Sequence, residues 1–324
     1  MTEKEYYKEK RVSSSSLKWF EISPLFFRKM LDKEIEQLPM RWLEIGKKVH
    51  MKLLENEEFN KNYIFLDYST PKSENQKKFC EDYITFRSKR MEDKLIYAYK
   101  KNYTADKLPK EKIIERATEL KQQLSKYITY LKKRSEYKDI LTYSDNKLIN
   151  DLEQCVKDHI AANKLIYLTD EDRMNNIEEY NENIIFFKFL DIECKAMLDR
   201  LIIDHKNKII KLIDIKTTSN LSEFNRSFEE FKYYRQLAFY WIAIHHSWTI
   251  FNLVSNIDYK KESYIIGLQK GDIPECKVFN IEESWLSKGL NEIESILPEI
   301  KWHYDNNLWN HSRFYYENNG IEKL

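Results

Sequence analysis

Two acids and a lysine lie near the ends of two predicted strands. Asp214 and Lys216 close an apolar run, and Asp199 lies fifteen residues upstream of Asp214. Because side chains alternate between the two faces of a strand, Asp214 and Lys216 share one face while Ile215 points into the core. A second predicted strand, 195–203, brings Asp199 beside them. Two acids and a lysine in this arrangement predict Mg²⁺-dependent cleavage of a phosphodiester bond.

The chemistry of that cleavage explains why these residue types are needed. A water must be activated and charge on the phosphate neutralised, and one or two Mg²⁺ ions do both. Mg²⁺ takes hard oxygen ligands, so we expect Asp199, Asp214 and the backbone carbonyl of Ile215 to bind it. Lys216 holds the attacking water or stabilises the developing negative charge. The tripeptide alone often arises by chance, so a solvated strand end is the alternative.

Two further segments carry candidate site residues. Gln236 and Tyr240 lie four residues apart on a predicted helix, one turn after Tyr233, and share a helical face. An amide in so apolar a segment needs a partner if it is buried. Gly46 and His50 share a face of another predicted helix, 40–55. Taken alone, such a histidine is more often an ordinary surface or helix residue than a metal ligand.

The order of predicted elements indicates an α/β fold. Serines at 13–16 and Ser23-Pro24 are typical helix starts. Residues 74–165 read as almost wholly helical, and the chain then changes to strands, the first three of which form an antiparallel meander. The predicted helices are 13–20, one from Ser23-Pro24, 40–55, 108–134, 224–246 and 282–304; the predicted strands are 63–66, 184–192, 195–204, 209–216, 249–257, 263–268 and 278–281. Strands and flanking helices in this order predict a mixed β-sheet covered by helices.

We expect the whole chain, 1–324, to form a single nuclease domain. Its predicted parts are an N-terminal helical part, 12–66, a large helical insertion, 74–183, and a catalytic α/β core, 184–304. Glycine and proline are scarce, with 5 and 6 copies, which favours long helices.

The strand and helix motifs resemble a known family. Leu198-Asp199-Arg200, the run 212–218 and the run 233–240 are together similar to the PD-(D/E)xK nuclease superfamily, whose core is of the restriction-endonuclease type. Within it they resemble the RecE/RecB-like exonucleases, especially phage-type RecE homologues. Gln236 and Tyr240 match the Q-x-x-x-Y motif of that group, which implies contact with a nucleotide or with Lys216. One departure is Leu198, which stands where the superfamily name has proline.

The N-terminal part extends the resemblance, which spans about residues 12–66 and 184–304. Residues 13–17 match a serine-rich opening element, and Gly46 to His50 match G-x-x-x-H, followed by Leu53-Leu54-Glu55. The resemblance implies that His50 is a ligand of the metal. A further acid just upstream of Asp199 is often useful in this family, and Glu193 is the candidate. Because neutral imidazole suits Mn²⁺ better than Mg²⁺, Mn²⁺ is an expected alternative cofactor.

The resemblance implies digestion of duplex DNA from an end, in phage or mobile-element recombination or replication. A single-strand annealing protein is then an expected partner, and related exonucleases form ring-shaped homo-oligomers. Two alternatives stay open: a structure-specific or nicking endonuclease, and a non-catalytic DNA-binding protein on a nuclease fold. An exonuclease leaves covalently closed circular DNA whole, which distinguishes it from an endonuclease. A non-catalytic protein should show no Mn²⁺ binding that depends on Asp199 and Asp214 in calorimetry.

Composition limits the class of protein. The formal net charge is +1, so any surface for DNA must be a local patch. Clusters such as 87–90 and 132–134 are candidates, although such clusters are often merely solvated. The four cysteines are spread without a CxxC pair, which argues against zinc. Some nucleases of the resembled type hold an iron–sulfur cluster with cysteines grouped near the C-terminus, but only Cys276 lies there, so we expect free, buried thiols instead. We expect no signal peptide, no membrane span and a cytoplasmic location, in a bacterium or a phage-infected cell.

Overall fold

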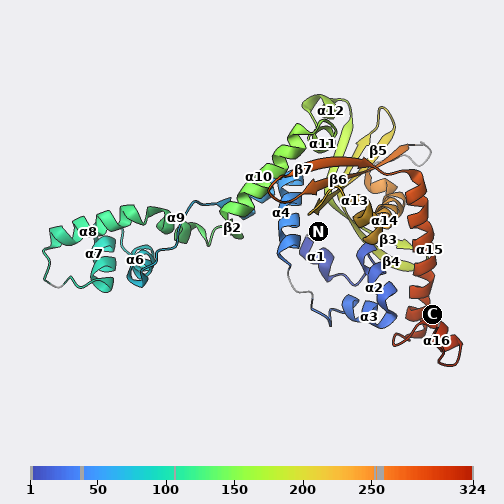
Figure 1. Cartoon of the computed structure of the whole chain (residues 1–324), viewed down its shortest axis with the longest axis horizontal. Coiled ribbons are helices and arrows are strands. Elements are labelled where there is room, and N and C mark those ends of the chain that lie inside the picture. The colour runs from blue at the N-terminus through green and yellow to red at the C-terminus, as the bar shows by residue number, and fades with distance from the viewer. Residues whose placement is uncertain (1–2, 37–39, 106, 252, 254–258, 323–324) are drawn as a thin grey trace. The chain divides into compact units, whose positions relative to one another are not determined.

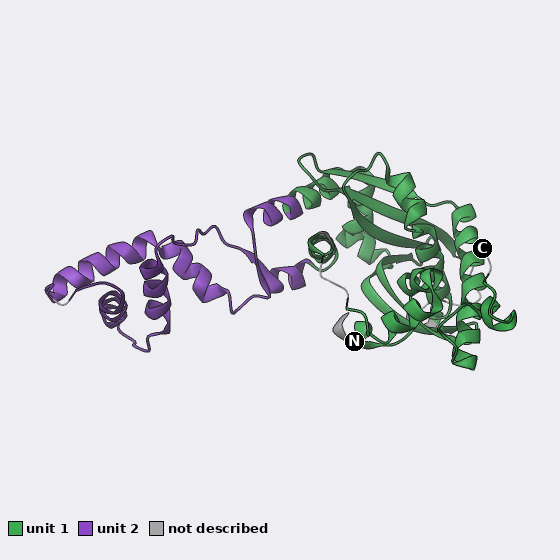
Figure 2. Cartoon of the chain, turned by 60° about the horizontal axis from the view of Figure 1, so that its bottom comes forward, with its two compact units in different colours: residues 1–55, 150–324 green, residues 56–149 purple. Residues whose placement is uncertain are grey.

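The computed structural model describes residues 3–36, 40–105, 107–251, 253 and 259–322. The chain divides into two compact units, which Figure 2 colours separately. Unit 1 comprises residues 1–55 and 150–324, and unit 2 comprises residues 56–149. Unit 2 therefore begins and ends earlier than the expected insertion, 74–183. That the whole chain acts as one nuclease domain stays a prediction.

A five-stranded mixed sheet forms the centre of unit 1 and confirms the predicted α/β class. Its strand order is β3-β4-β5-β6-β7, with β3 to β5 antiparallel, β5 and β6 parallel, and β6 and β7 antiparallel. The strands are β3 (Ile177–Phe189), β4 (Ile192–Asp204), β5 (Ile209–Thr218), β6 (Lys260–Gln269) and β7 (Glu275–Asn280). The predicted meander is confirmed, although β3 begins earlier than expected because residues 177–181 and 183 also pair with β4.

Helices cover this sheet. α14 packs on β3 and β4, and α15 packs on α14 (Figure 1). The helices of unit 1 are α1 (Glu3–Lys8), α2 (Ser14–Ile22), α3 (Pro24–Leu31), α4 (Arg41–Leu54), α11 (Ile160–Ile166), α12 (Asp170–Met174), α13 (Phe224–Glu230), α14 (Tyr233–His245), α15 (Glu283–Asn306) and α16 (Arg313–Glu317). α10 (Tyr143–Asp158) belongs to both units. The predicted start at Ser23 is confirmed, since its hydroxyl accepts the Phe26 N–H at 3.0 Å.

Two predicted elements of unit 1 differ from the structure. The helix predicted over 224–246 is two helices, because Lys232 adopts a left-handed conformation with φ 51° between α13 and α14. The strand predicted over 249–257 is wrong at its start, where a 3₁₀ helix spans Trp248–Phe251. The rest of that prediction, residues 252 and 254–257, lies outside the described residues.

Unit 2 is helical around its own core, which includes Phe79, Leu95, Ile113 and Ile128. The helix predicted over 108–134 is broken at Leu124, which lets α8 pack on α7 while α9 packs on α6. Its elements are α5 (Asn56–Asn62), β1 (Tyr63–Phe65), α6 (Glu74–Thr85), α7 (Met91–Asn102), α8 (Lys110–Gln123), α9 (Ser125–Lys133) and β2 (Asp139–Leu141). β1 pairs in parallel with β2, a strand that the sequence pattern did not indicate.

The four cysteines are free thiols, as predicted; Cys80 and Cys194 are buried, whereas Cys155 and Cys276 are only partly buried. Among the described residues no helix combines the length and apolar character needed to span a bilayer.

Candidate metal and active site

Neighbouring strands bring Asp199, Asp214 and Lys216 together. Asp199 and Asp214 lie one position beyond the last β4–β5 pair, Arg200 with Ile213. The Asp199 carboxylate accepts the Ile215 N–H at 2.8 Å, which joins the two strands at this point. Lys216 Nζ lies 2.6 Å from Asp214 Oδ2. Asp214 is only 1% exposed, and the Ile215 side chain is buried as the alternation predicted.

His50 reaches the same place from α4. Its Nδ1 lies 3.5 Å from Asp199 Oδ2, across 149 residues of chain. Gly46 lets α4 come this close to β5, because a Cβ atom at that position would lie 3.3 Å from the Thr217 hydroxyl. The G-x-x-x-H spacing therefore has a physical reason. The glycine permits close packing of α4 on β5, and His50, one turn later, lies beside Asp199 as a result.

Glu182 joins the cluster and was missed from the sequence. Its Oε1 lies 3.8 Å from His50 Nδ1, and the ligand atoms of His50, Glu182 and Asp199 all lie within 4.8 Å of one another. The expected additional acid, Glu193, instead pairs with Arg11 and is largely exposed. Both acids belong to the same strand pair, β3 and β4, but only knowledge of the register shows which one lies opposite Asp199.

The backbone at Glu182 is strained. Pairing between β3 and β4 holds at Asn181 and resumes at Asn183, and Glu182 between them has φ 45°. A left-handed conformation is unfavourable for a residue with a Cβ atom, and such strain is concentrated at functional sites. The distortion supports a role for Glu182 beyond that of an ordinary strand residue.

Burial and opposing charges shift the pKa values of the clustered groups. The pKa of Asp214 is raised overall, chiefly because the carboxyl group is buried. The charge of Lys216 lowers this pKa, and the charge of Asp199 raises it. Burial alone would lower the pKa of His50, but the charges of Asp199 and Glu182 raise it overall. Burial opposes the charge on Lys216 too, yet Asp214 and Asp199 raise its pKa. Lys216 is thus held as an ammonium in the metal-free protein.

The donors fit a divalent cation. Although Asp214 is buried and Lys216 is close, neither of its carboxylate oxygens has a partner in hydrogen-bonding geometry among the described residues. Leaving a buried carboxylate in this state is costly, and a bound cation would satisfy it. The carboxylates are hard oxygen donors that suit Mg²⁺ or Mn²⁺, and the one imidazole nitrogen favours Mn²⁺. The part played by the Ile215 carbonyl stays a prediction.

The α14 face holds the other predicted pair. Gln236 Nε2 donates to the Tyr240 hydroxyl at 2.6 Å, so the amide has the partner that its apolar surroundings required. Burial, followed by the charges of Asp214 and Asp199, places the pKa of Tyr240 well above its usual value. The ring of Tyr233 lies 5.0 Å from Lys216 Nζ. These side chains therefore border the acids and the lysine.

A buried arginine supports the strands that carry the cluster. Arg200, 1% exposed, donates to the Leu165 carbonyl at 2.7 Å, Asn181 Oδ1 at 2.6 Å and Glu179 Oε2 at 2.5 Å. Asn181 in turn donates to the Leu54 carbonyl at the end of α4 at 3.0 Å. Residues adjacent to Asp199 and Glu182 thus fasten β3 and β4 to the helix that carries His50.

The sheet and the cluster together define a nuclease-like fold of the PD-(D/E)xK type, which confirms the predicted superfamily. The chain belongs to the family described as a PDDEXK-like domain of unknown function, which it matches over residues 13–312. The finer assignment to RecE-like exonucleases stays a prediction.

A solved structure shares the fold. A protein from Eubacterium rectale, described as a "putative exonuclease", aligns with TM-score 0.54 and 13% identity over 100% of this chain and 95% of that one. The structure of SSO0001 aligns with TM-score 0.23 and 11% identity over 74% of this chain and 91% of that one, a likeness too low to indicate a common fold. No curated protein matches the sequence.

Proposed function

We propose that this protein is a Mg²⁺- or Mn²⁺-dependent deoxyribonuclease that digests duplex DNA from its ends. The observation that carries the proposal is the meeting of His50, Glu182 and Asp199 within 4.8 Å, beside the buried Asp214 and its ion-pair partner Lys216. Exonucleolytic action is supported by the Q-x-x-x-Y spacing of Gln236 and Tyr240 and by the description of the Eubacterium rectale protein.

Each residue has a proposed role. His50, Glu182, Asp199 and Asp214 would hold the cation, which supplies charge to polarise the phosphate and to acidify water. Lys216, as an ammonium beside Asp214, stabilises negative charge that develops on the phosphate oxygens. The buried hydroxyl of Tyr240, fixed by Gln236, orients the terminal nucleotide or Lys216. A role in phage or mobile-element recombination, with an annealing partner and a ring-shaped oligomer, belongs to the same proposal.

Asp199→Asn tests the site against Glu193→Gln, a matched control on the same strand. We expect Asp199→Asn to lower the rate of digestion of end-labelled linear duplex by at least about a hundredfold, on the scale of losing one charge-stabilising group. Glu193→Gln should retain the wild-type rate, because Glu193 pairs with Arg11 at the surface. Digestion should require Mg²⁺ or Mn²⁺ and stop in EDTA.

The substrate form decides between the proposal and its alternatives. An exonuclease leaves covalently closed circular DNA intact, whereas nicking of the circle would indicate an endonuclease. Absence of both cleavage and Asp199-dependent Mn²⁺ binding in calorimetry would indicate a non-catalytic protein. Full metal-dependent digestion by folded Asp199→Asn protein would contradict the site itself.

A further inference from the structure

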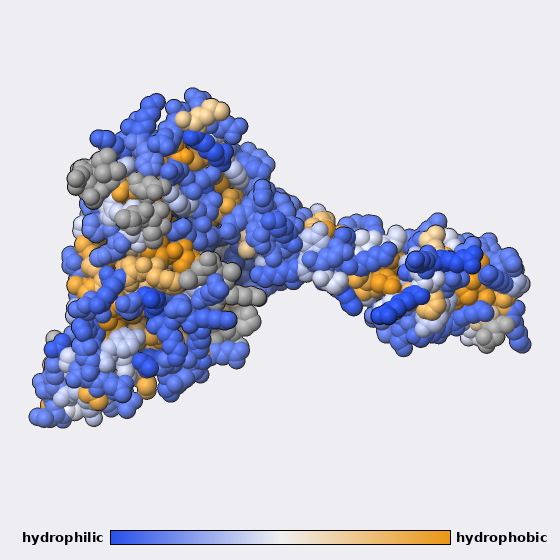
Figure 3. Space-filling model, turned by 180° about the vertical axis from the view of Figure 1, so that it is seen from behind, coloured by the Kyte–Doolittle hydropathy of each residue, from blue (hydrophilic) through white to orange (hydrophobic). Residues whose placement is uncertain are grey.

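Charge is divided unevenly between the two units. Unit 2 contains 21 Lys and Arg against 15 Asp and Glu, a formal charge of +6, which leaves −5 for the rest of the chain. The unit that holds the acidic site therefore repels a polyanion overall, and unit 2 attracts it. Figure 3 shows hydrophilic residues over most of the visible face of unit 2. A substrate with a phosphate backbone needs such an attractive surface.

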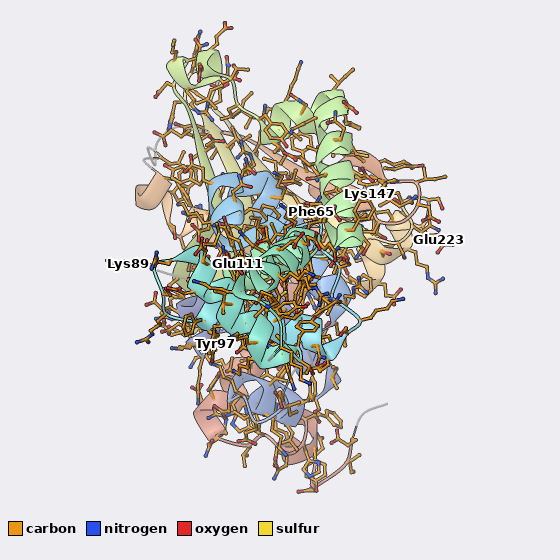
Figure 4. The ribbon with its side chains drawn as sticks, turned by 90° about the vertical axis from the view of Figure 1, so that its left-hand side faces the viewer. Phe65, Lys89, Tyr97, Glu111, Lys147 and Glu223 are labelled. Carbon is orange, nitrogen blue, oxygen red and sulfur yellow. The ribbon has the colours of Figure 1, made fainter. Side chains whose placement is uncertain are left out.

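The loop between α6 and α7 concentrates this charge. Arg87, Lys89 and Arg90 are exposed, and in the described ranges none of them forms an ion pair with an acid. Lys89 projects away from the ribbon in Figure 4. The two acids that follow, Glu92 and Asp93, lie in the first turn of α7, where the helix dipole favours negative charge. Three neighbouring cations are thus left to solvent.

The second basic cluster differs in this respect. Lys133 forms an ion pair with Glu136, so the charge of residues 132–134 is partly neutralised. Other lysines of unit 2 are paired in the same way: Lys61 with Glu58, Lys77 with Glu74, and Lys126 with Asp67. The absence of such partners distinguishes the loop at 86–90 from these surface charges.

One stacked pair of aromatic rings borders the loop. Phe86 stacks on Tyr97 with ring centroids 4.1 Å apart, and Lys101 Nζ lies 5.5 Å from the centroid of Tyr97. The Arg90 N–H donates to the Ser88 hydroxyl at 3.1 Å, which donates to Asp93 at 3.0 Å. Phe86 covers one face of the Tyr97 ring, although Tyr97 is still 38% exposed. The loop therefore presents three cations beside one partly covered ring, a composition that favours contact with phosphates over base stacking on a single strand.

We propose that Arg87, Lys89 and Arg90 form a binding surface for the phosphate backbone of duplex DNA. The inference rests on the proposed function for the identity of the polyanion. The contacts are independent of sequence, and they give unit 2 a role in holding DNA that is separate from the residues of the cleavage site.

Fluorescence polarisation with a labelled blunt duplex tests this surface, in EDTA so that cleavage does not intervene. The variant R87A/K89A/R90A is compared with K61A/K77A/K126A, which removes the same charge from lysines that have acidic partners. The binding constant falls as salt rises, and each lost phosphate contact makes the negative slope of log K against log salt shallower by about 1. We therefore expect the slope of the loop variant to be shallower than that of the wild type by about 3. Its affinity should fall at least about tenfold, while the control changes little.

Several results would contradict the proposed DNA-binding surface. Equal losses in both variants would show that only net charge matters, and unchanged slopes would show no contact at all. A loss confined to a single strand of the same length would assign the loop to single-stranded nucleic acid instead. Equal melting temperatures of the two variants exclude unfolding as the cause.

The cleavage assay keeps the two proposals apart. If wild-type protein binds duplex through the loop but never cleaves it in Mn²⁺, the nuclease proposal is wrong and the proposed binding surface still holds. Protein that cleaves, while the loop variant binds as tightly as wild type, would remove the surface alone.

Discussion

Asp214 is buried and bears a charge opposite to that of Lys216, whose side chain is 18% exposed. Asp214 is 1% exposed, and Lys216 Nζ lies 2.6 Å from its carboxylate. Removing one partner of a buried ion pair leaves the other charge uncompensated, which is more damaging than never having the pair. The residues that we assign to chemistry therefore also affect folding, and activity losses on mutation must be separated from instability.

Lys216→Ala should destabilise the metal-free protein in a pH-dependent way. Burial already raises the pKa of Asp214, and loss of the ammonium raises it further. A carboxyl group with a folded pKa above its unfolded pKa stabilises the fold at low pH, and that stability is lost as pH rises through the folded pKa. We expect a loss of about 3 kcal/mol near neutral pH and a smaller one in acid, measured by urea unfolding in EDTA.

The double variant Asp214→Asn/Lys216→Ala supplies the control for this prediction. With no carboxyl group at position 214, the extra dependence on pH should disappear. A Lys216→Ala protein whose stability relative to wild type is the same in acid and at neutral pH would show that the pair is not coupled to folding as described.

At the level of elements, the site depends on how closely α4 approaches β5. A Cβ atom on Gly46 would lie 3.3 Å from the Thr217 hydroxyl, and His50 lies one turn further along the helix. Asn181 secures the far end of α4 through the Leu54 carbonyl. Two contacts on α4, on either side of His50, therefore set its position against Asp199.

Substitutions at Gly46 should move His50 in a graded way. The Cβ of Gly46→Ala meets the Thr217 hydroxyl at 3.3 Å, a contact that a shift of a few tenths of an ångström relieves, so Mn²⁺ affinity should stay near wild type. The larger side chain of Gly46→Leu must displace α4, and we expect Mn²⁺ affinity to fall by about tenfold or more, as for other residues that orient metal ligands. Titration calorimetry measures both. Wild-type affinity in Gly46→Leu protein that still binds through His50 would contradict this account.

The sequence predicted those parts of the site that local rules determine. Strand alternation placed Asp214 with Lys216, and helical spacing placed Gln236 with Tyr240 and Gly46 with His50. Glu182 was not predicted, because its position opposite Asp199 depends on the register of β3 on β4 and on an unfavourable φ that no local pattern indicates. The break at Lys232 was not predicted for a similar reason. Tertiary packing, and not the intrinsic propensity of lysine, determines its left-handed backbone conformation.

At the scale of the whole molecule, acidic chemistry and basic binding belong to different parts of the chain. Unit 1 contains every proposed ligand, and the hydrophobic cluster described around its sheet includes no residue of unit 2. Unit 2 has its own core and an excess of cations. The chain leaves and re-enters unit 1 at one place, since Lys52 and Glu153 of unit 1 form an ion pair at 3.5 Å. Such an insertion point allows the two activities to be separated physically.

Replacing residues 56–149 by a short glycine–serine linker should therefore leave unit 1 folded. Because the side chains just before and after the excised segment already touch, a few residues suffice to close the gap, and each doubling of loop length costs only about 0.6 kcal/mol. We expect the shortened protein to bind Mn²⁺ through His50 and Asp199 with wild-type affinity in calorimetry, and to lose most duplex affinity because its formal charge is −5. Retained, salt-dependent duplex binding by the shortened protein would place the DNA surface in unit 1, and loss of Mn²⁺ binding from a folded protein would show that the metal site needs unit 2.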